Sequence, residues 1–229
     1  MIQPEFKPLI VILSDKLFRI PEYQRHYSWQ TKQRNELFED IKKLQTAREK
    51  YDERTHFMAT IVCLKTKDKE QVGSNTFYVY DVVDGQQRIT TLVILLKAIS
   101  LKLKTEEQLD EAKELDKLLV KDDGRLIILQ NNHDNRLILR RYLKDGQEPQ
   151  GDSINTVADK NISQAIKDCE KFVNKGFSDK KETYKKASLM LLNEIVSDNG
   201  LERSVWDKEA INYRREQLIK FAMEQWKDL

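Results

Sequence analysis

The stretch from Tyr78 to Leu96, YVYDVVDGQQRITTLVILL, constrains the fold of this chain more than any other part of it. Its first part, Tyr78 to Val83, is mostly apolar and predicts a buried strand. The pattern breaks at Asp84-Gly85, and a helical pattern follows at once, with apolar residues on one face at Ile89, Leu92, Val93 and Leu96. The chain must therefore turn sharply from a strand into a helix.

This strand-to-helix turn is a candidate anion-binding site. The first N–H groups of a helix lack partners inside the helix and carry roughly half a positive charge. Gly85 allows a sharp turn or a close approach to a ligand, and Arg88 can direct two donors onto a phosphate or a carboxylate. The residues alone leave a structural alternative open, in which Asp84 caps the helix and Arg88 pairs with a surface carboxylate.

Composition limits the class of protein. The chain has 229 residues, 34% of them charged, with seven glycines and four prolines, and this indicates a soluble, helix-rich protein of one or two domains. A net charge of +2 does not indicate nucleic-acid binding by itself. We expect a cytoplasmic protein without a membrane partner, because no apolar run approaches the roughly 20 residues of a membrane span. Cys63 and Cys169 lie among apolar residues and are predicted to be buried thiols.

The segment before the turn is predicted to contain two strands and one helix. Leu9 to Leu13 is a short apolar run that predicts a strand. The run from Thr31 to Lys50 has the period of an amphipathic helix. His56 to Thr66 predicts a strand, which the polar run Lys65 to Asn75 joins to Phe77–Val83 as a hairpin or neighbouring pair.

The segment after the turn is mostly helical. We expect helices from Gln86 to Lys104 and from Glu106 to Val120, then a strand from Arg125 to Gln130 and another helix. The polar run Lys144 to Thr156 contains Gly146, Pro149 and Gly151 and resembles a linker. Three further helices are predicted beyond it, at Val157–Lys175, Ser178–Ser197 and Asp207–Leu229. The predicted domains are therefore 1–145 and 146–229.

The polar loop after Pro21 is a second candidate site. Pro21 fixes an extended entry, so Tyr23, Gln24 and Arg25 should lie in an exposed loop. Aromatic, amide and guanidinium groups close together suit stacking on a base and hydrogen bonding to its edge or to phosphate. The alternative, which we favour for Tyr27 and Trp29, is that these rings pin the loop to the core.

Four segments carry a resemblance to a known family: FRIPEYQRHYSW (Phe18–Trp29), NELFEDI (Asn35–Ile41), HFMATIVCL (His56–Leu64) and VVDGQQRITTL (Val82–Leu92). Together they resemble the family called domain of unknown function 262, the N-terminal half of GmrSD-type modification-dependent restriction enzymes. The resemblance covers residues 1–145. It implies an α+β fold similar to ParB and sulfiredoxin, with a small mixed sheet and packed helices, followed here by an all-helical C-terminal module.

The same resemblance implies a site. In the ParB and sulfiredoxin fold a Gly-x-x-Arg turn at a helix start binds nucleotide phosphates, and Gly85 and Arg88 match it. Asp134-Asn135 matches an Asp-Asn pair that precedes a helix in the family. His133 beside that pair could carry protons, although a histidine in such a turn more often bonds to the backbone.

The leading functional hypothesis is a sensor domain of a prokaryotic modified-DNA restriction or phage-defence system that binds GTP, ATP or CTP with Mg²⁺ and hydrolyses it slowly. Arg88 would neutralise charge in the transition state, and Asp84 would hold Mg²⁺ or orient water. Either Gln86 or Gln87 would position the attacking water. The other expected contacts are the N–H groups of Gly85, Gln86 and Gln87, the side chains of Gln24 and Arg25, and the hydroxyls of Thr90 and Thr91, unless these threonines bond back to the helix.

Two other functions remain open. One is a non-catalytic module that reads modified DNA through Tyr23, Arg25 and Tyr27. The other is an accessory protein that acts with a separate nuclease chain or as a homo-oligomer. Gly176–Leu192 and Val205–Trp226 resemble the closing segments of the HNH nuclease half, but His133 is the only histidine after residue 56. We therefore expect no nuclease site, and expect the helical tail to be a packing or docking module.

Overall fold

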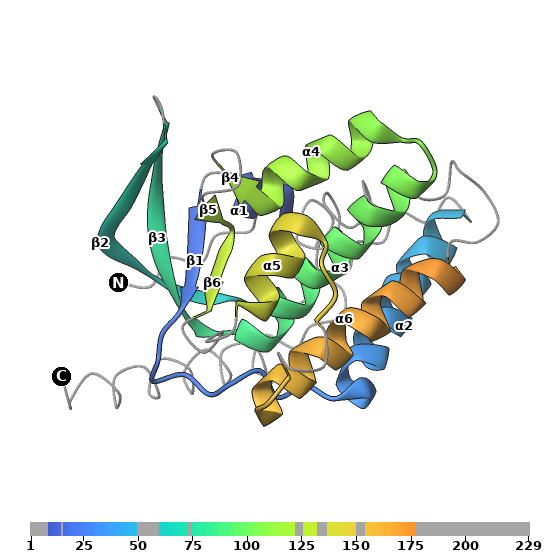
Figure 1. The fold of residues 1–229 in the computed structure, drawn as a ribbon, viewed down its shortest axis with the longest axis horizontal. Coiled ribbons are helices and arrows are strands. Elements are labelled where there is room, and N and C mark those ends of the chain that lie inside the picture. The colour runs from blue at the N-terminus through green and yellow to red at the C-terminus, as the bar shows by residue number, and fades with distance from the viewer. Residues whose placement is uncertain are drawn as a thin grey trace, which may run out of the picture. The chain divides into compact units, whose positions relative to one another are not determined.

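The computed structural model describes residues 9–14, 16–49, 60–72, 75–121, 126–131, 137–149 and 154–176. All of them belong to the larger of two compact units, Met1–Asp198. In this unit a small sheet lies beside a group of helices (Figure 1). The helices are α1 (Leu9–Ser14), α2 (Thr31–Glu49), α3 (Gln86–Thr105), α4 (Leu109–Leu119), α5 (Ile138–Asp145) and α6 (Val157–Gly176). The strands are β1 (Lys16–Ile20), β2 (Val62–Val72), β3 (Asn75–Asp84), β4 (Val120–Lys121), β5 (Leu126–Ile127) and β6 (Leu129–Asn131).

The main sheet has four strands in the order β2-β3-β1-β6 and is mixed. β1 pairs in parallel with both β3 and β6, whereas β2 and β3 form an antiparallel hairpin. β4 and β5 form a separate two-stranded sheet. The predicted α+β class with a small mixed sheet is confirmed, and so is the predicted hairpin.

Helix α3 is the centre of the hydrophobic core. Every residue from Ile89 to Ser100 is buried, and the helix contacts α4, α5 and α6 (Figure 1). A helix that is apolar on most faces must be covered on most faces, so the predicted core helix is confirmed. Its buried Lys97 is paired with Asp116 of α4 at 3.0 Å. No helix in the described ranges is long and apolar enough to cross a membrane.

Two sequence predictions for the early elements are wrong. Leu9–Leu13 was predicted to be a strand but belongs to helix α1, whose Leu9 and Leu13 are both buried. Residues four apart share a helix face, and a run this short has no decisive period. The second error concerns the bounds of the first hairpin strand. β2 begins at Val62 and continues to Val72, through residues that were expected to connect the two strands. Residues 56–59 lie outside the described ranges.

The strand predicted at Arg125–Gln130 is divided between two sheets. β5 pairs with β4, and β6 pairs with β1. Ile128, between them, forms a backbone hydrogen bond on each side. Its N–H donates to the Leu119 carbonyl at 2.8 Å, and its carbonyl accepts from Phe18 N–H at 2.8 Å. This residue is therefore the point at which the backbone passes from one sheet to the other.

Helix α6 shares the core of the elements that precede it, which corrects the domain boundary predicted at residue 146. The Phe172 ring stacks on Phe38 of α2, with 4.4 Å between ring centroids and 9° between ring planes. Asp168 of α6 forms an ion pair with Arg34 of α2. The run Lys144–Thr156 therefore joins two parts of one core. The helices predicted at Ser178–Ser197 and Asp207–Leu229 lie outside the described residues.

Both cysteines are free thiols, as predicted. Cys169 is buried in α6 and Cys63 is half-buried in β2. Burial raises the pKa of the Cys63 thiol to about 12, so this thiol stays protonated and unreactive near neutral pH.

Replacing Phe172 with alanine tests whether α6 belongs to this core. The change removes a stacked, buried ring, and we expect it to lower the free energy of unfolding by about 3 kcal/mol. Lys171→Ala, at an exposed position of the same helix, should change it by less than about 0.5 kcal/mol. Urea unfolding followed by circular dichroism measures both. Equal stability of the two variants would show that α6 is a separate module.

Candidate anion site at the start of helix α3

The candidate site is the turn between β3 and α3. β3 ends at Asp84, and Gly85 follows in the left-handed conformation, with φ 86° and ψ 6°. The Gly85 carbonyl begins the helix by accepting from Arg88 N–H at 3.1 Å and Ile89 N–H at 3.0 Å. Among the described residues no side chain caps this end of the helix, so the alternative in which Asp84 is the cap is wrong. The first N–H groups of α3 are therefore open to another acceptor.

Gly85 is required by both conformation and space. An L residue rarely adopts its positive φ, which costs about 1–2 kcal/mol. A Cβ atom at this position would lie 3.2 Å from the Thr60 carbonyl oxygen and 3.3 Å from Ile61 Cα. The backbone that leads into β2 therefore lies directly behind the turn.

Arg88 lies one turn into α3, and its guanidinium is half-buried. The Cζ atom is 5.9 Å from the centre of the Trp29 ring, at the end of the loop that follows β1. Burial lowers the pKa of Arg88, and the nearby charge of Asp84 opposes this effect. Within the described part of the chain Arg88 forms no ion pair or side-chain hydrogen bond, so the expected alternative of a carboxylate partner is not found there. A charged, partly desolvated fork of donors is thus available to an anion.

Gln87 holds the loop between β1 and α2 against α3. Its Oε1 accepts from Ser28 N–H at 2.7 Å and from Trp29 N–H at 3.2 Å. Its Nε2 donates to the His26 carbonyl at 3.1 Å. Both polar atoms of this side chain are therefore engaged by the protein. The sequence led us to expect that Gln87 faces a ligand. Its clamping role was missed because its partners lie about sixty residues earlier in the chain.

The loop reaches the turn at a second point through Gln24. Its Nε2 donates to the Val83 carbonyl at 3.0 Å, directly before Asp84-Gly85. Gln24 therefore lies beside the turn, as the family resemblance implies. Arg25, next to it, is exposed to solvent.

The two tyrosines of the loop differ in exposure. Tyr23 is 67% exposed and is able to stack on a ligand. Tyr27 is only 4% exposed, and its hydroxyl lies 2.9 Å from Thr91 Oγ1. Burial raises the pKa of Tyr27 to about 12. Tyr27 therefore anchors the loop to the core, the alternative favoured from the sequence, and its ring is not accessible for a base contact.

The first-turn polar residues of α3 are mostly turned inward. Thr91 donates back to the Gln87 carbonyl at 2.8 Å, so the back-bonding alternative holds for this threonine. Thr90 is buried, and a ligand would reach its hydroxyl only after neighbouring side chains moved. Gln86 is 6% exposed, and its side chain has no hydrogen-bond partner among the residues described. His133, Asp134 and Asn135 lie outside the described ranges.

Asp84 is the carboxylate placed at the turn, and it is exposed at the end of β3. The described ranges contain no cluster of three or more His, Cys, Asp and Glu side chains able to hold a metal ion. A protein-only metal cage is therefore not found among them. The arrangement is instead compatible with Mg²⁺, which is often held by one or two carboxylates together with phosphate oxygens and water.

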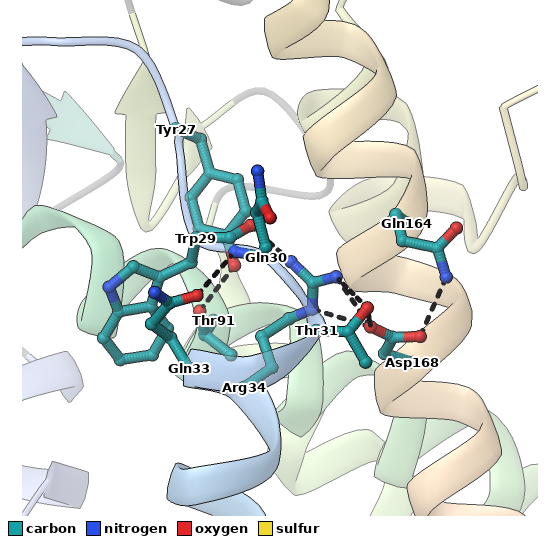
Figure 2. A network of polar contacts seen from close by, with 9 residues as sticks. All are labelled: Tyr27, Trp29, Gln30, Thr31, Gln33, Arg34, Thr91, Gln164 and Asp168. Atoms are coloured by element: carbon teal, nitrogen blue, oxygen red, sulfur yellow. Dashed lines mark hydrogen bonds and ion pairs between the residues drawn. The ribbon is translucent and has the colours of Figure 1, made fainter.

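Behind the loop lies a buried polar network that sequence analysis missed (Figure 2). Arg34 of α2 is 1% exposed, and its Nη2 lies 2.6 Å from Asp168 Oδ2 of α6. It also donates to the carbonyl oxygen of Trp29 through Nη1. The sequence did hold one sign that Arg34 is buried: it lies on the same helix face as the apolar residues Leu37, Phe38 and Ile41 of α2.

Gly85→Ala tests the left-handed turn. We expect it to lower the free energy of unfolding by about 1–2 kcal/mol, because alanine at positive φ is strained. Gly85→Asn should cost less, because asparagine tolerates this conformation while adding the same Cβ atom. Urea denaturation of both variants measures the difference. Wild-type stability of the alanine variant would mean that residue 85 is free to leave the left-handed region.

Comparison with known proteins places these features in one family. The family model described as the N-terminal domain of the GmrSD restriction endonuclease matches residues 9–227. The match extends well beyond residue 145, so this N-terminal-domain family also covers the tail that the sequence comparison likened to a nuclease half. No curated protein matches the chain.

Proposed function

Because the chain belongs to the family of GmrSD restriction endonuclease N-terminal domains, we propose that it is a sensor domain that binds a nucleoside triphosphate at the Gly85–Arg88 turn. Membership of the family makes the protein a component of a restriction or phage-defence system. Such a system includes DNA and a nuclease domain or subunit. The nucleotide is our proposal, and the geometry of the turn supports it.

The observation that carries the proposal is the half-buried Arg88 guanidinium beside the open end of α3. Taking a charged group partly out of water has a cost, which its own carboxylate partner usually offsets. In the described structure Arg88 has a cation–π contact with Trp29 but no ion pair. The charge of Asp84 acts on Arg88 from nearby without an ion pair. A triphosphate would supply the direct anionic contact, and the N–H groups at the start of the helix would donate to the same phosphates.

Each residue of the turn has a distinct role in this proposal. The N–H groups of Gly85 and Gln86 bind phosphate oxygens, and Arg88 binds them through two donors. The side chain of Gln87 does not contact the ligand, because it holds the loop that carries Trp29. Gln24 fixes the loop to the strand end, which leaves the exposed Arg25 and Tyr23 able to contact the nucleoside or the outer phosphate.

Mg²⁺ fits this arrangement through Asp84, with phosphate oxygens and water as the remaining ligands. When bound, the ion would neutralise charge on the phosphates. Slow hydrolysis would then depend on Arg88, which stabilises charge on the transferred group, and on a residue that orients water. Gln86 suits that second role better than Gln87, because its amide has no hydrogen-bond partner in the described residues. Its side chain is 6% exposed, so it would have to turn outward to reach the water.

A second candidate function is recognition of DNA without chemistry. The observation that favours it is the exposure of Tyr23 next to the exposed Arg25, which suits stacking on an unpaired or modified base. Here Arg88 would bind a backbone phosphate instead of a nucleotide. The two functions are distinguished by two measurements: how steeply DNA binding weakens with salt, and whether phosphate is released from a nucleotide.

Nucleotide binding is tested by thermal shift of the purified chain with GTP, ATP and CTP, each with and without Mg²⁺. A ligand that binds only the native state raises the melting temperature. We expect Arg88→Ala to weaken binding about ten- to hundredfold, since a charge-assisted hydrogen bond contributes about 1.5–3 kcal/mol. Arg88→Lys should be intermediate, because it keeps the charge and loses the fork.

Arg141→Ala is the matched control, because Arg141 is an exposed arginine on α5. It should bind nucleotide as the wild type does. If no triphosphate raises the melting temperature, the nucleotide proposal is wrong. DNA binding that weakens steeply with salt, with no release of phosphate from any nucleotide, would then favour the second function.

A further inference from the structure

Trp29, the residue on which Arg88 lies, is held through its backbone from both sides. Its N–H donates to Gln87 Oε1 at 3.2 Å, and its carbonyl oxygen accepts from Arg34 Nη1. The indole is half-buried and packs on the core. The position of the ring, and with it the surface available to Arg88, therefore depends on Gln87 and Arg34.

Arg34 is itself fixed by α6. Its Nε and Nη2 donate to Asp168 Oδ2 at 2.9 and 2.6 Å (Figure 2). Thr31 Oγ1 donates to the same oxygen at 3.1 Å, and Gln164 Nε2 donates to Asp168 Oδ1 at 2.8 Å. Arg34 is almost fully buried, and these bonds, with a further one from Nη2 to Thr31 Oγ1 at 3.2 Å, fix the direction of its guanidinium. A continuous set of contacts thus runs from α6 through Arg34 and Trp29 to Arg88.

We propose that Arg34 and Asp168 are positioning residues of the anion site: they fix Trp29 as the surface on which the Arg88 guanidinium lies, and so make phosphate affinity depend on the packing of α6. The proposal rests on the proposed function of Arg88. Neither Arg34 nor Asp168 contacts the ligand in it.

A buried charge pair is weak evidence for a stabilising role. Removing two charges from water costs about as much as their attraction returns, and apolar side chains often replace a buried pair without loss of stability. The planar guanidinium of Arg34 does orient its partners, because its donors point in fixed directions toward one oxygen of Asp168 and toward one backbone carbonyl. The carbonyl that it selects belongs to Trp29. A movement of α6 would therefore shift Arg34 and Trp29, and with them the surface on which Arg88 lies.

The test uses the full chain with Trp206→Phe and Trp226→Phe, which leaves Trp29 as the single tryptophan among the three in the sequence. Sodium tripolyphosphate is the probe, because it presents the phosphates without a base. Two quantities are measured for each variant: the emission spectrum of Trp29 and the affinity for tripolyphosphate by calorimetry. The key variant combines Arg34→Met with Asp168→Leu, which removes both charges and avoids leaving one buried charge unpaired.

We expect the double replacement to shift Trp29 emission in the same direction as Arg88→Met does. It should weaken tripolyphosphate binding about five- to tenfold, as expected for coupled neighbours. In the Arg88→Met background it should cause no further loss, because it acts through Arg88. Trp29→Phe should keep most of the affinity and Trp29→Leu should lose it. Gln164→Ala is the control, since it contacts Asp168 at the exposed side only.

A purely structural role would lower the melting temperature of the double replacement and leave emission and affinity unchanged, and that result overturns the proposal. Unchanged emission in Arg88→Met also overturns it, because the guanidinium would then not lie on the indole. If the wild-type chain binds no tripolyphosphate, the proposed function fails. The emission of the two variants then decides separately whether Arg34 and Asp168 set the position of Arg88.

Discussion

The three hydrogen bonds of the Gln87 side chain are the interaction on which the rest of the site depends. They join the first turn of α3 to the backbone of residues 26–29, and so bring together two motifs that lie far apart in the chain. Without them, Trp29 would be held only through its carbonyl oxygen by Arg34, and the loop would be held only by Gln24 at the strand end and by Tyr27 in the core. A residue of the motif that looks like a ligand contact is thus the main structural support of the site.

Much of the fold was predictable because the signals are local. The period of α3 and the glycine before it specify the turn, and the apolar run Phe77–Val83 after the polar run Lys65–Asn75 specifies the second strand of the hairpin. The error at Leu9–Leu13 has the opposite cause, because five apolar residues fit a strand and a buried helix equally well. The error at residue 146 is different again. Gly146 does end α5 in a left-handed conformation, but a break in secondary structure is not a break in the core.

The site was predictable in position and less so in detail. Gly85 and Arg88 are specified by backbone geometry and by distance along one helix, both of which the sequence reveals. Tyr23 and Tyr27 lie in the same polar loop, and the anchoring role favoured for Tyr27 from the sequence is confirmed by its burial, although its partner Thr91 was not predicted. Arg34 is harder still, because its partner Asp168 is more than one hundred residues away. Tertiary contacts of that range leave no pattern in a single sequence.

The sheet topology has a consequence for synthesis on the ribosome. β1 emerges early, yet its two parallel neighbours are β3 and β6, which end at residues 84 and 131. One backbone edge of β1 therefore stays unpaired until β3 has been synthesised, and the other edge stays unpaired until β6 has been synthesised as well. During that interval the unpaired edge of β1 is open to aggregation or to chaperone binding, a hazard that ends once β6 is in place.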